Sequence, residues 1–233
     1  MEIHSTATTL NRPTSVFAKV KNRVGRWPEL IAWRDNELMR SLGLRRLLMQ
    51  DLKRHMYDWT LPGFRALAVY RFGTWAHATR FVPLRILLVW FHVILFRLVR
   101  NRYGIELYAS CIIGRRFLIG HQSGIVIHRF ARFGDDCLIR QNVTFGEAGM
   151  GRDNFGDGLG PVIGNNVDIG AGAVVMGNVR IGDNVRIGPN SVIMTDIPAN
   201  ATVMAPPSRT MVRPCPEAFS LPNSSTEDRR VEC

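Results

Sequence analysis

The sequence lacks several patterns that commonly mark a catalytic or metal centre. Its four cysteines are scattered along the chain without a C-x-x-C spacing, so neither a zinc site nor a disulfide framework is predicted. No G-x-S-x-G motif marks an activated serine, and no nucleic-acid-binding motif accompanies the basic residues. The first residues are polar and carry no apolar stretch with a cleavage site, so we expect no export and a cytoplasmic location.

Acidic residues are scarce in the N-terminal part of the chain. Residues 1–102 hold 18 Lys and Arg against 6 Asp and Glu, whereas residues 103–233 hold 12 against 13. A basic surface of this kind attracts anionic lipid, nucleic acid or an acidic substrate. Because no nucleic-acid motif is present, we expect no nucleic-acid partner and predict peripheral contact with an anionic membrane, at its inner face.

Branched apolar residues recur every six positions in the C-terminal half: Ile163, Ile169, Val175, Ile181, Ile187 and Ile193. The same spacing holds over residues 107–125 and, after a two-residue shift between Ile125 and Ile127, over residues 127–145. A period of six is typical of a hexapeptide β-solenoid. The branched residue packs into a narrow core, and the coils stack to bury it. The sequence therefore predicts a mainly β protein, a left-handed parallel β-helix with an α-helical N-terminal region.

The predicted organisation has four parts. Residues 1–35 are basic and expected to be loosely ordered, residues 36–102 form a helical region, residues 103–213 form the β-helix, and residues 214–233 form a disordered tail. A glycine-rich stretch without branched apolar residues interrupts the repeat at residues 146–161. Long loops in compact domains tend to bind ligands, so this stretch is predicted to be an extruded binding loop.

The most apolar segment of the chain is residues 84–99, within a helix expected after Pro83. It has 16 positions and contains Arg85, His92 and Arg97, which makes it short and charged for a membrane-spanning helix. We predict instead a helix that lies on a membrane surface or packs against the β-helix or a neighbouring subunit.

Two histidines, His121 and His128, are the only ones within the repeat. A three-histidine metal site within one chain is therefore not available, and no metal is expected. His121 follows Gly120 and the inward Ile119, which places it on a corner of the coil. There it would act as a general base on a bound alcohol.

A histidine base needs its second nitrogen held, usually by a carboxylate or a carbonyl. Glu106 lies 15 positions before His121, three fewer than a full coil of three hexapeptides. This spacing predicts that Glu106 lies on an adjacent coil, at a neighbouring corner. Asp135 and Asp136 are alternatives, although the stretch "GDDC" is typical of polar turn residues.

A family resemblance rests on the stretches "GIELYASCIIGRRFLIGHQSGIVIHRFARFGDDCLIRQNVTFGEAGMG" and "VIGNNVDIGAGAVVMGNVRIGDNVRIGPNSVIMTDIPANATVMAPPSRTM". Together they resemble the serine-acetyltransferase-like branch of the left-handed β-helix acyltransferases. Within that branch the chain looks closest to O-acetyltransferases of capsule and exopolysaccharide synthesis, of the colanic acid type. The resemblance covers residues 62–213 and is strongest from residue 104 onward.

The resemblance implies an enzyme that transfers an acetyl group from acetyl-CoA. It assigns His121 as the catalytic base, which promotes direct attack of the acceptor hydroxyl on the thioester, and Glu106 as the carboxylate that orients it. It further implies a homotrimer with active sites between subunits and no metal requirement. Positions that match the family's acetyl-CoA site are Gly146, Ala171, Gly172, Pro189, Asn190 and Arg209.

Two departures from the serine acetyltransferases bear on the acceptor. Those enzymes carry an aspartate where this chain has Gly120, and an Arg-His-Pro where it has Leu159-Gly160-Pro161. Their absence argues for a sugar hydroxyl of a polysaccharide or its lipid-linked precursor. Candidate acceptor-binding residues are then His128, Arg152, Asp153 and Asp157, although His128 also fits a surface turn.

Two alternatives stay open. The chain could be a serine O-acetyltransferase, the acceptor of the family that it resembles. It could also be a non-catalytic hexapeptide scaffold at a membrane, since the repeat alone specifies a fold and no chemistry.

Overall fold

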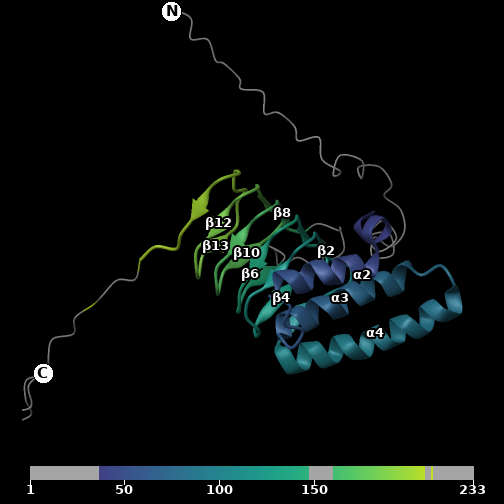
Figure 1. The fold of residues 1–233 in the computed structure, drawn as a ribbon. Helices are drawn as coiled ribbons and strands as arrows, with labels where there is room; N and C mark the ends of the chain where they lie inside the picture. The colour runs from purple at the N-terminus through teal and green to yellow at the C-terminus, as the bar shows by residue number, and fades with distance from the viewer. Residues whose placement is uncertain (1–36, 147–159, 208–210, 212–233) are drawn as a thin grey trace, which may run out of the picture.

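The computed structural model describes residues 37–146, 160–207 and 211. Within these residues, three helices precede a column of short strands, and the helices lie side by side at one end of that column (Figure 1). The basic segment 1–35, the tail 214–233 and most of the predicted loop lie outside the described residues.

Local sequence features explain where the helices begin and end. Helix α2 runs over Glu37–Arg54 with a break at Gly43, whose φ is 74°, helix α3 over Pro62–Ala78 and helix α4 over Val82–Tyr103. Both α3 and α4 have a proline in the first turn, where a missing N–H costs little. Helix α4 ends at the left-handed Gly104, whose N–H donates to the carbonyl of Arg100.

Each strand of the column has two or three residues. In chain order they are β1 (Ile105–Leu107), β2 (Ile112–Ile113), β3 (Leu118–Ile119), β4 (Ile125–Ile127), β5 (Arg132–Phe133), β6 (Leu138–Ile139), β7 (Thr144–Gly146), β8 (Val162–Ile163), β9 (Asp168–Ile169), β10 (Val174–Met176), β11 (Arg180–Ile181), β12 (Arg186–Ile187), β13 (Val192–Ile193) and β14 (Thr202–Val203).

The strands form three parallel sheets, ordered β1-β4-β7-β10-β13, β2-β5-β8-β11 and β3-β6-β9-β12-β14. Apart from β12 and β14, which are two apart in chain order, each strand pairs with the strand three places further along the chain. One coil therefore contributes one strand to each sheet. This arrangement confirms the predicted parallel β-solenoid of hexapeptide repeats with an N-terminal helical region.

The coils differ in length, and the differences locate the insertions. Ile169 pairs with Ile187, the spacing that a coil of three hexapeptides requires. Ile139 pairs with Ile169, which lies two hexapeptides further along the chain than such a coil would place its partner. The additional residues of this coil fall between β7 and β8, where the loop was predicted.

The first coil is also longer than three hexapeptides, because Ile119 pairs with Ile139 rather than with Cys137, the partner that a coil of three hexapeptides would give. The additional length lies in the corner between β3 and β4, residues 120–124, which we call the long corner. The predicted shift between Ile125 and Ile127 was therefore placed wrongly, since both side chains are buried in β4. The long corner turns through two left-handed residues, Ser123 and Gly124.

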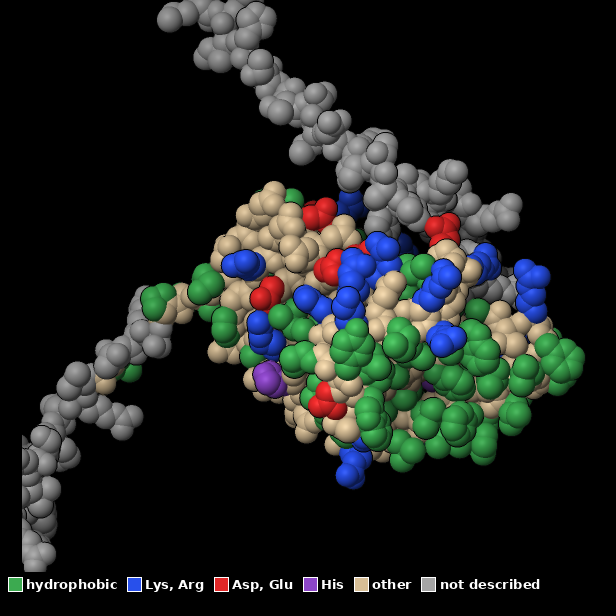
Figure 2. Space-filling view, viewed as in Figure 1, with side chains coloured by type: hydrophobic (Ala, Val, Ile, Leu, Met, Phe, Trp, Pro, Cys, Tyr) green, Lys and Arg blue, Asp and Glu red, His purple; other side chains and the backbone are tan. Residues whose placement is uncertain are grey.

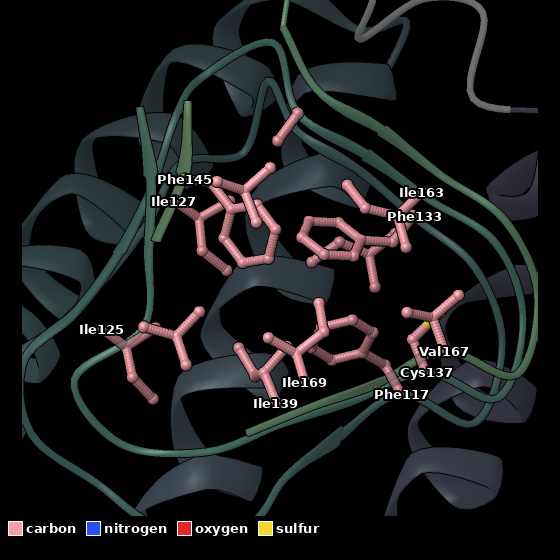
Figure 3. Close-up of a cluster of buried hydrophobic side chains, with 14 of the residues drawn as sticks. Phe117, Ile125, Ile127, Phe133, Cys137, Ile139, Phe145, Ile163, Val167 and Ile169 are labelled. Atoms are coloured by element: carbon pink, nitrogen blue, oxygen red, sulfur yellow. The ribbon is translucent and has the colours of Figure 1, made fainter. Parts of the chain in front are cut away.

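The core of the column is a ladder of side chains from successive coils (Figure 3). Phe133 lies between Phe117 and Phe145, with ring centroids 5.2 and 4.9 Å apart and edge-to-face geometry. All three rings are fully buried. Burial of apolar rings and branched side chains supplies the main favourable term of the fold.

The helices are attached to the first coil by buried polar contacts. The fully buried Arg71 of α3 pairs with the fully buried Asp51 of α2 at 2.8 Å. Its guanidinium also donates to the carbonyl oxygens of Ile113, at 2.8 Å, and Gly114, at 2.5 Å. The neighbouring Tyr70 donates its hydroxyl to the carbonyl of Cys111 at 2.8 Å. Arg71 thus joins two helices and the second strand through one side chain.

We expect Arg71→Met to lower the free energy of unfolding by about 3–5 kcal/mol, because it leaves the Asp51 carboxylate buried without its partner. Denaturant titration measures this change. The control is Arg116→Met, which breaks a half-exposed pair with Asp136 and should cost at most about 1 kcal/mol. Equal losses in the two variants would contradict the role given to Arg71.

Candidate active site

A pocket of about 480 Å³ lies between the start of α3 and the long corner. The exposed His121 is on its wall. Helix α3 approaches so closely that a Cβ on Gly63 would lie 2.3 Å from the carbonyl oxygen of Ile119. The first turn of α3 is therefore a fixed wall. The residues lining the pocket are Leu61, Pro62, Gly63, Ile119, Gly120, His121, Gln122 and Gln141.

Gln141 is a pocket residue that sequence reasoning missed. Since Ile119 pairs with Ile139, Gln141 occupies the position on the next coil that matches His121. Its side-chain oxygen is buried and has no hydrogen-bond partner, so it can accept a hydrogen bond from a ligand in the pocket. The two-residue shift in the repeat is the signal that could have identified it, because that shift lengthens the first coil.

Glu106 lies in the middle of β1, opposite Val126 of β4, rather than at the corner that the sequence predicted. Its carboxylate accepts a short hydrogen bond from the hydroxyl of Tyr108. This bond raises the pKa of Tyr108, because it stabilises the protonated phenol. The long corner, which contains His121, packs on the end of α4 just before this strand, where the N–H of Ser123 donates to the carbonyl of Tyr103 at 3.0 Å.

Four of the predicted acetyl-CoA positions lie along the same edge of the column as His121. Ala171 and Pro189 follow Gln141 down this edge, because Ile139, Ile169 and Ile187 stack in register. Backbone bonds hold the edge together: the N–H of Gly172 donates to the carbonyl of Gln141 at 3.0 Å, and that of Asn190 to Ala171 at 2.9 Å.

The other predicted site residues lie elsewhere. Gly146 ends β7 beside His128, whose N–H donates to the carbonyl of Phe145 at 3.0 Å. Both residues therefore lie at the ends of β4 and β7 that are opposite to the His121 edge. The His128 ring accepts the Phe130 N–H at 3.4 Å, as a turn residue would. Arg152, Asp153, Asp157 and Arg209 lie outside the described residues.

The alternative carboxylates belong to the surface. Asp135 pairs with Arg115 and Asp136 with Arg116, so both are engaged in turns of the column. Across the described residues, no three His, Cys, Asp or Glu side chains gather in a way that could hold a metal ion.

The two described cysteines, Cys111 and Cys137, are buried inside the column. Burial raises the pKa of each thiol to about 12. Because the thiolate is the nucleophile, neither cysteine suits covalent catalysis at neutral pH. Among the residues that line the pocket, His121 is the one whose side chain can take up or release a proton near neutral pH.

Comparison with known sequences places the chain among the hexapeptide-repeat transferases. Residues 160–195 match the family described as bacterial transferase hexapeptide (six repeats). The chain is 34% identical to the serine acetyltransferase of Helicobacter pylori (strain 26695) over 176 residues, which cover 74% of this chain and 96% of the relative. The chain belongs to the hexapeptide-repeat acetyltransferases of the serine acetyltransferase type, with their left-handed β-helix.

Other relatives differ in coverage. The serine acetyltransferase of Synechococcus elongatus is 37% identical over 72% of this chain, which spans 64% of that relative. The putative colanic acid biosynthesis acetyltransferase WcaB of Escherichia coli K12 is 38% identical over 52% of this chain and 72% of its own length. The serine acetyltransferases cover more of this chain than WcaB does, which favours the serine alternative over the expected sugar acceptor.

A solved structure shows the same fold. Serine acetyltransferase isoform 3 of Entamoeba histolytica, in complex with cysteine, superposes with a TM-score of 0.60 and 26% identity. The superposition covers 73% of this chain and 61% of the other. The chain thus spans less than two thirds of that protein.

We expect Gln141→Leu to raise the KM for the acceptor about tenfold, with a smaller change in kcat, because one hydrogen bond is lost. Steady-state kinetics measure the two constants. Unfolding stability should stay the same or rise, since the variant removes an unpartnered buried oxygen. Gln122→Leu on the same wall is the control, and equal KM values for wild type and Gln141→Leu would contradict the assignment.

Proposed function

We propose that this protein is an acetyl-CoA-dependent O-acetyltransferase with His121 as its general base. The observation that carries the proposal is the common edge: His121 lies on the same edge of the column as Ala171, Gly172, Pro189 and Asn190, which match the acetyl-CoA positions of the family. A base and a donor site on one edge bring the acceptor hydroxyl to the thioester.

The proposed reaction is a direct transfer. The imidazole of His121 takes the proton of the acceptor hydroxyl while the oxygen attacks the thioester carbonyl. The carbonyl reforms, the C–S bond breaks, and the proton passes from His121 to the leaving CoA thiolate. Glu106 is proposed to orient the imidazole, with its carboxylate held in turn by Tyr108.

L-serine is the first acceptor candidate, because serine acetyltransferases are among the relatives that cover most of this chain. A sugar hydroxyl is the second candidate, because Gly120 and Gly160 stand where the serine acetyltransferases carry an aspartate and a histidine. A Cβ on Gly160 would lie 2.8 Å from the backbone of Phe130, so the histidine that the family carries there does not fit. At Gly120 the nearest atoms would be 3.6 Å away, so the missing aspartate is not excluded by space.

The assembly and location are also proposals. We infer a homotrimer in the cytoplasm, where acetyl-CoA is available. The apolar outer face of the sheet that contains β4 and β13 supports self-association, with Val126 exposed by 41% and Val192 by 63%.

The test is release of CoA thiol from acetyl-CoA with L-serine or with surface-polysaccharide sugars as acceptors. We expect robust thiol release with one acceptor class. His121→Ala should then lower kcat about 10²- to 10⁴-fold, because it removes the base. His121 is exposed, so the variant should fold.

His128→Ala is the matched control, since this turn histidine lies at the other end of β4. It should keep kcat within about twofold of the wild-type value. Unchanged turnover in His121→Ala would overturn the assignment of the base. Thiol release with sugars and none with L-serine would reverse the order of the two acceptor candidates.

A further inference from the structure

Helix α4 presents an apolar face that the rest of the described chain leaves uncovered. One side of the helix packs on α3, where His92 is buried against Gly73. The opposite side carries Leu87, Trp90, Phe91, Ile94 and Leu98, which are 61, 65, 48, 37 and 61% exposed; we call these five residues the α4 face. Hydrophobic side chains gather over this helix in Figure 2. A contiguous apolar surface of this kind marks an interaction site.

Helix α4 is longer than the apolar segment 84–99 that the sequence indicated, and its 22 residues are long and apolar enough to cross a membrane. Among the described helices it is the one with this property, and almost none of it is buried. An apolar core helix of a soluble protein would be mostly covered, so the exposure separates α4 from that case.

Helices α3 and α4 carry basic side chains and no acidic ones. No Asp or Glu occurs from Trp59 to Ile105, a stretch that contains α3 and α4. The same stretch contains seven arginines, of which four are exposed, namely Arg80, Arg97, Arg100 and Arg102. Apolar side chains bordered by arginines complement an anionic lipid surface.

An apolar groove of about 500 Å³ continues the α4 face between α3 and α4. Trp59, Leu95 and Leu98 are among its lining residues, and Arg65 and Arg102 contribute the charged groups. Arg65 is held in place by donating to the hydroxyl of Tyr103 at 3.0 Å. A groove with apolar walls and fixed guanidinium groups suits an acyl chain beneath an anionic headgroup.

The attachment of α3 determines how α4 would meet a bilayer. Helix α3 is fixed to the first coil by Arg71 and Tyr70, and α4 packs beside α3. A spanning position for α4 would take α3 and the polar first coil into the hydrocarbon, at a high cost in buried polar groups. The geometry therefore fits a helix that lies in the plane of the interface.

We propose that the α4 face binds the surface of an anionic lipid bilayer, with the helix parallel to the membrane. A second copy of this chain fits less well, because a two-fold contact between identical α4 faces would bring arginines of like charge together. The proposal does not depend on the acetyltransferase function, since the α4 face and the His121 pocket use different residues.

The test is flotation of the full chain with vesicles of phosphatidylglycerol and phosphatidylcholine. We expect binding to these vesicles, weaker binding at high salt, and little binding to pure phosphatidylcholine. The double variant Leu87→Asn/Leu98→Asn should lower the partition coefficient at least about tenfold, because two leucines leave the interface. Arg97→Gln/Arg100→Gln should lower it by on the order of tenfold.

The matched control is Met194→Asn/Met204→Asn, which changes side chains of similar exposure on the column, 65 and 69%. It should bind within twofold of wild type. Failure of the full chain to float, or unchanged flotation of Leu87→Asn/Leu98→Asn, would overturn the proposal. A lower molar mass for that variant in lipid-free solution, by light scattering, would assign the α4 face to a second copy instead.

Discussion

The structure depends on the attachment of α3 to the open end of the first coil. Arg71 satisfies two backbone carbonyls of the first coil and the Asp51 carboxylate at once, so breaking this contact would leave several buried polar groups without partners. The same attachment brings Gly63 against the backbone of Ile119 and so forms the wall of the His121 pocket. It also fixes the direction of α4, which packs on the other side of α3.

The hexapeptide period predicts the column correctly, because each inward residue is buried by the same stacking in every coil. Corners are harder to predict, since additional residues there leave the inward pattern almost unchanged. The two-residue shift was expected between Ile125 and Ile127 instead of in the long corner, and Gln141 was not matched with His121. Glu106 was expected at a corner, although it lies in a strand. Hydrogen bonds such as the one from Tyr108 depend on side-chain direction, which a period of six does not specify.

The acceptor depends on few side chains. Serine acetyltransferases and the putative colanic acid acetyltransferase WcaB both match this chain, so the fold by itself does not identify the acceptor. At Gly160 the tight approach of Phe130 leaves no room for a side chain, whereas Gly120 has space for one. Packing against a neighbouring coil therefore requires glycine at position 160. The residue at position 120 is free to change with the acceptor.

If His121 is the base, it acts at the edge of the column to which acetyl-CoA binds. A crystal structure of the protein with CoA would show this edge. We expect the CoA thiol to lie within a few ångströms of the His121 imidazole and the rest of the cofactor to follow Ala171, Gly172 and Asn190 along the same edge. A CoA molecule bound along another edge, with its thiol remote from His121, would contradict it.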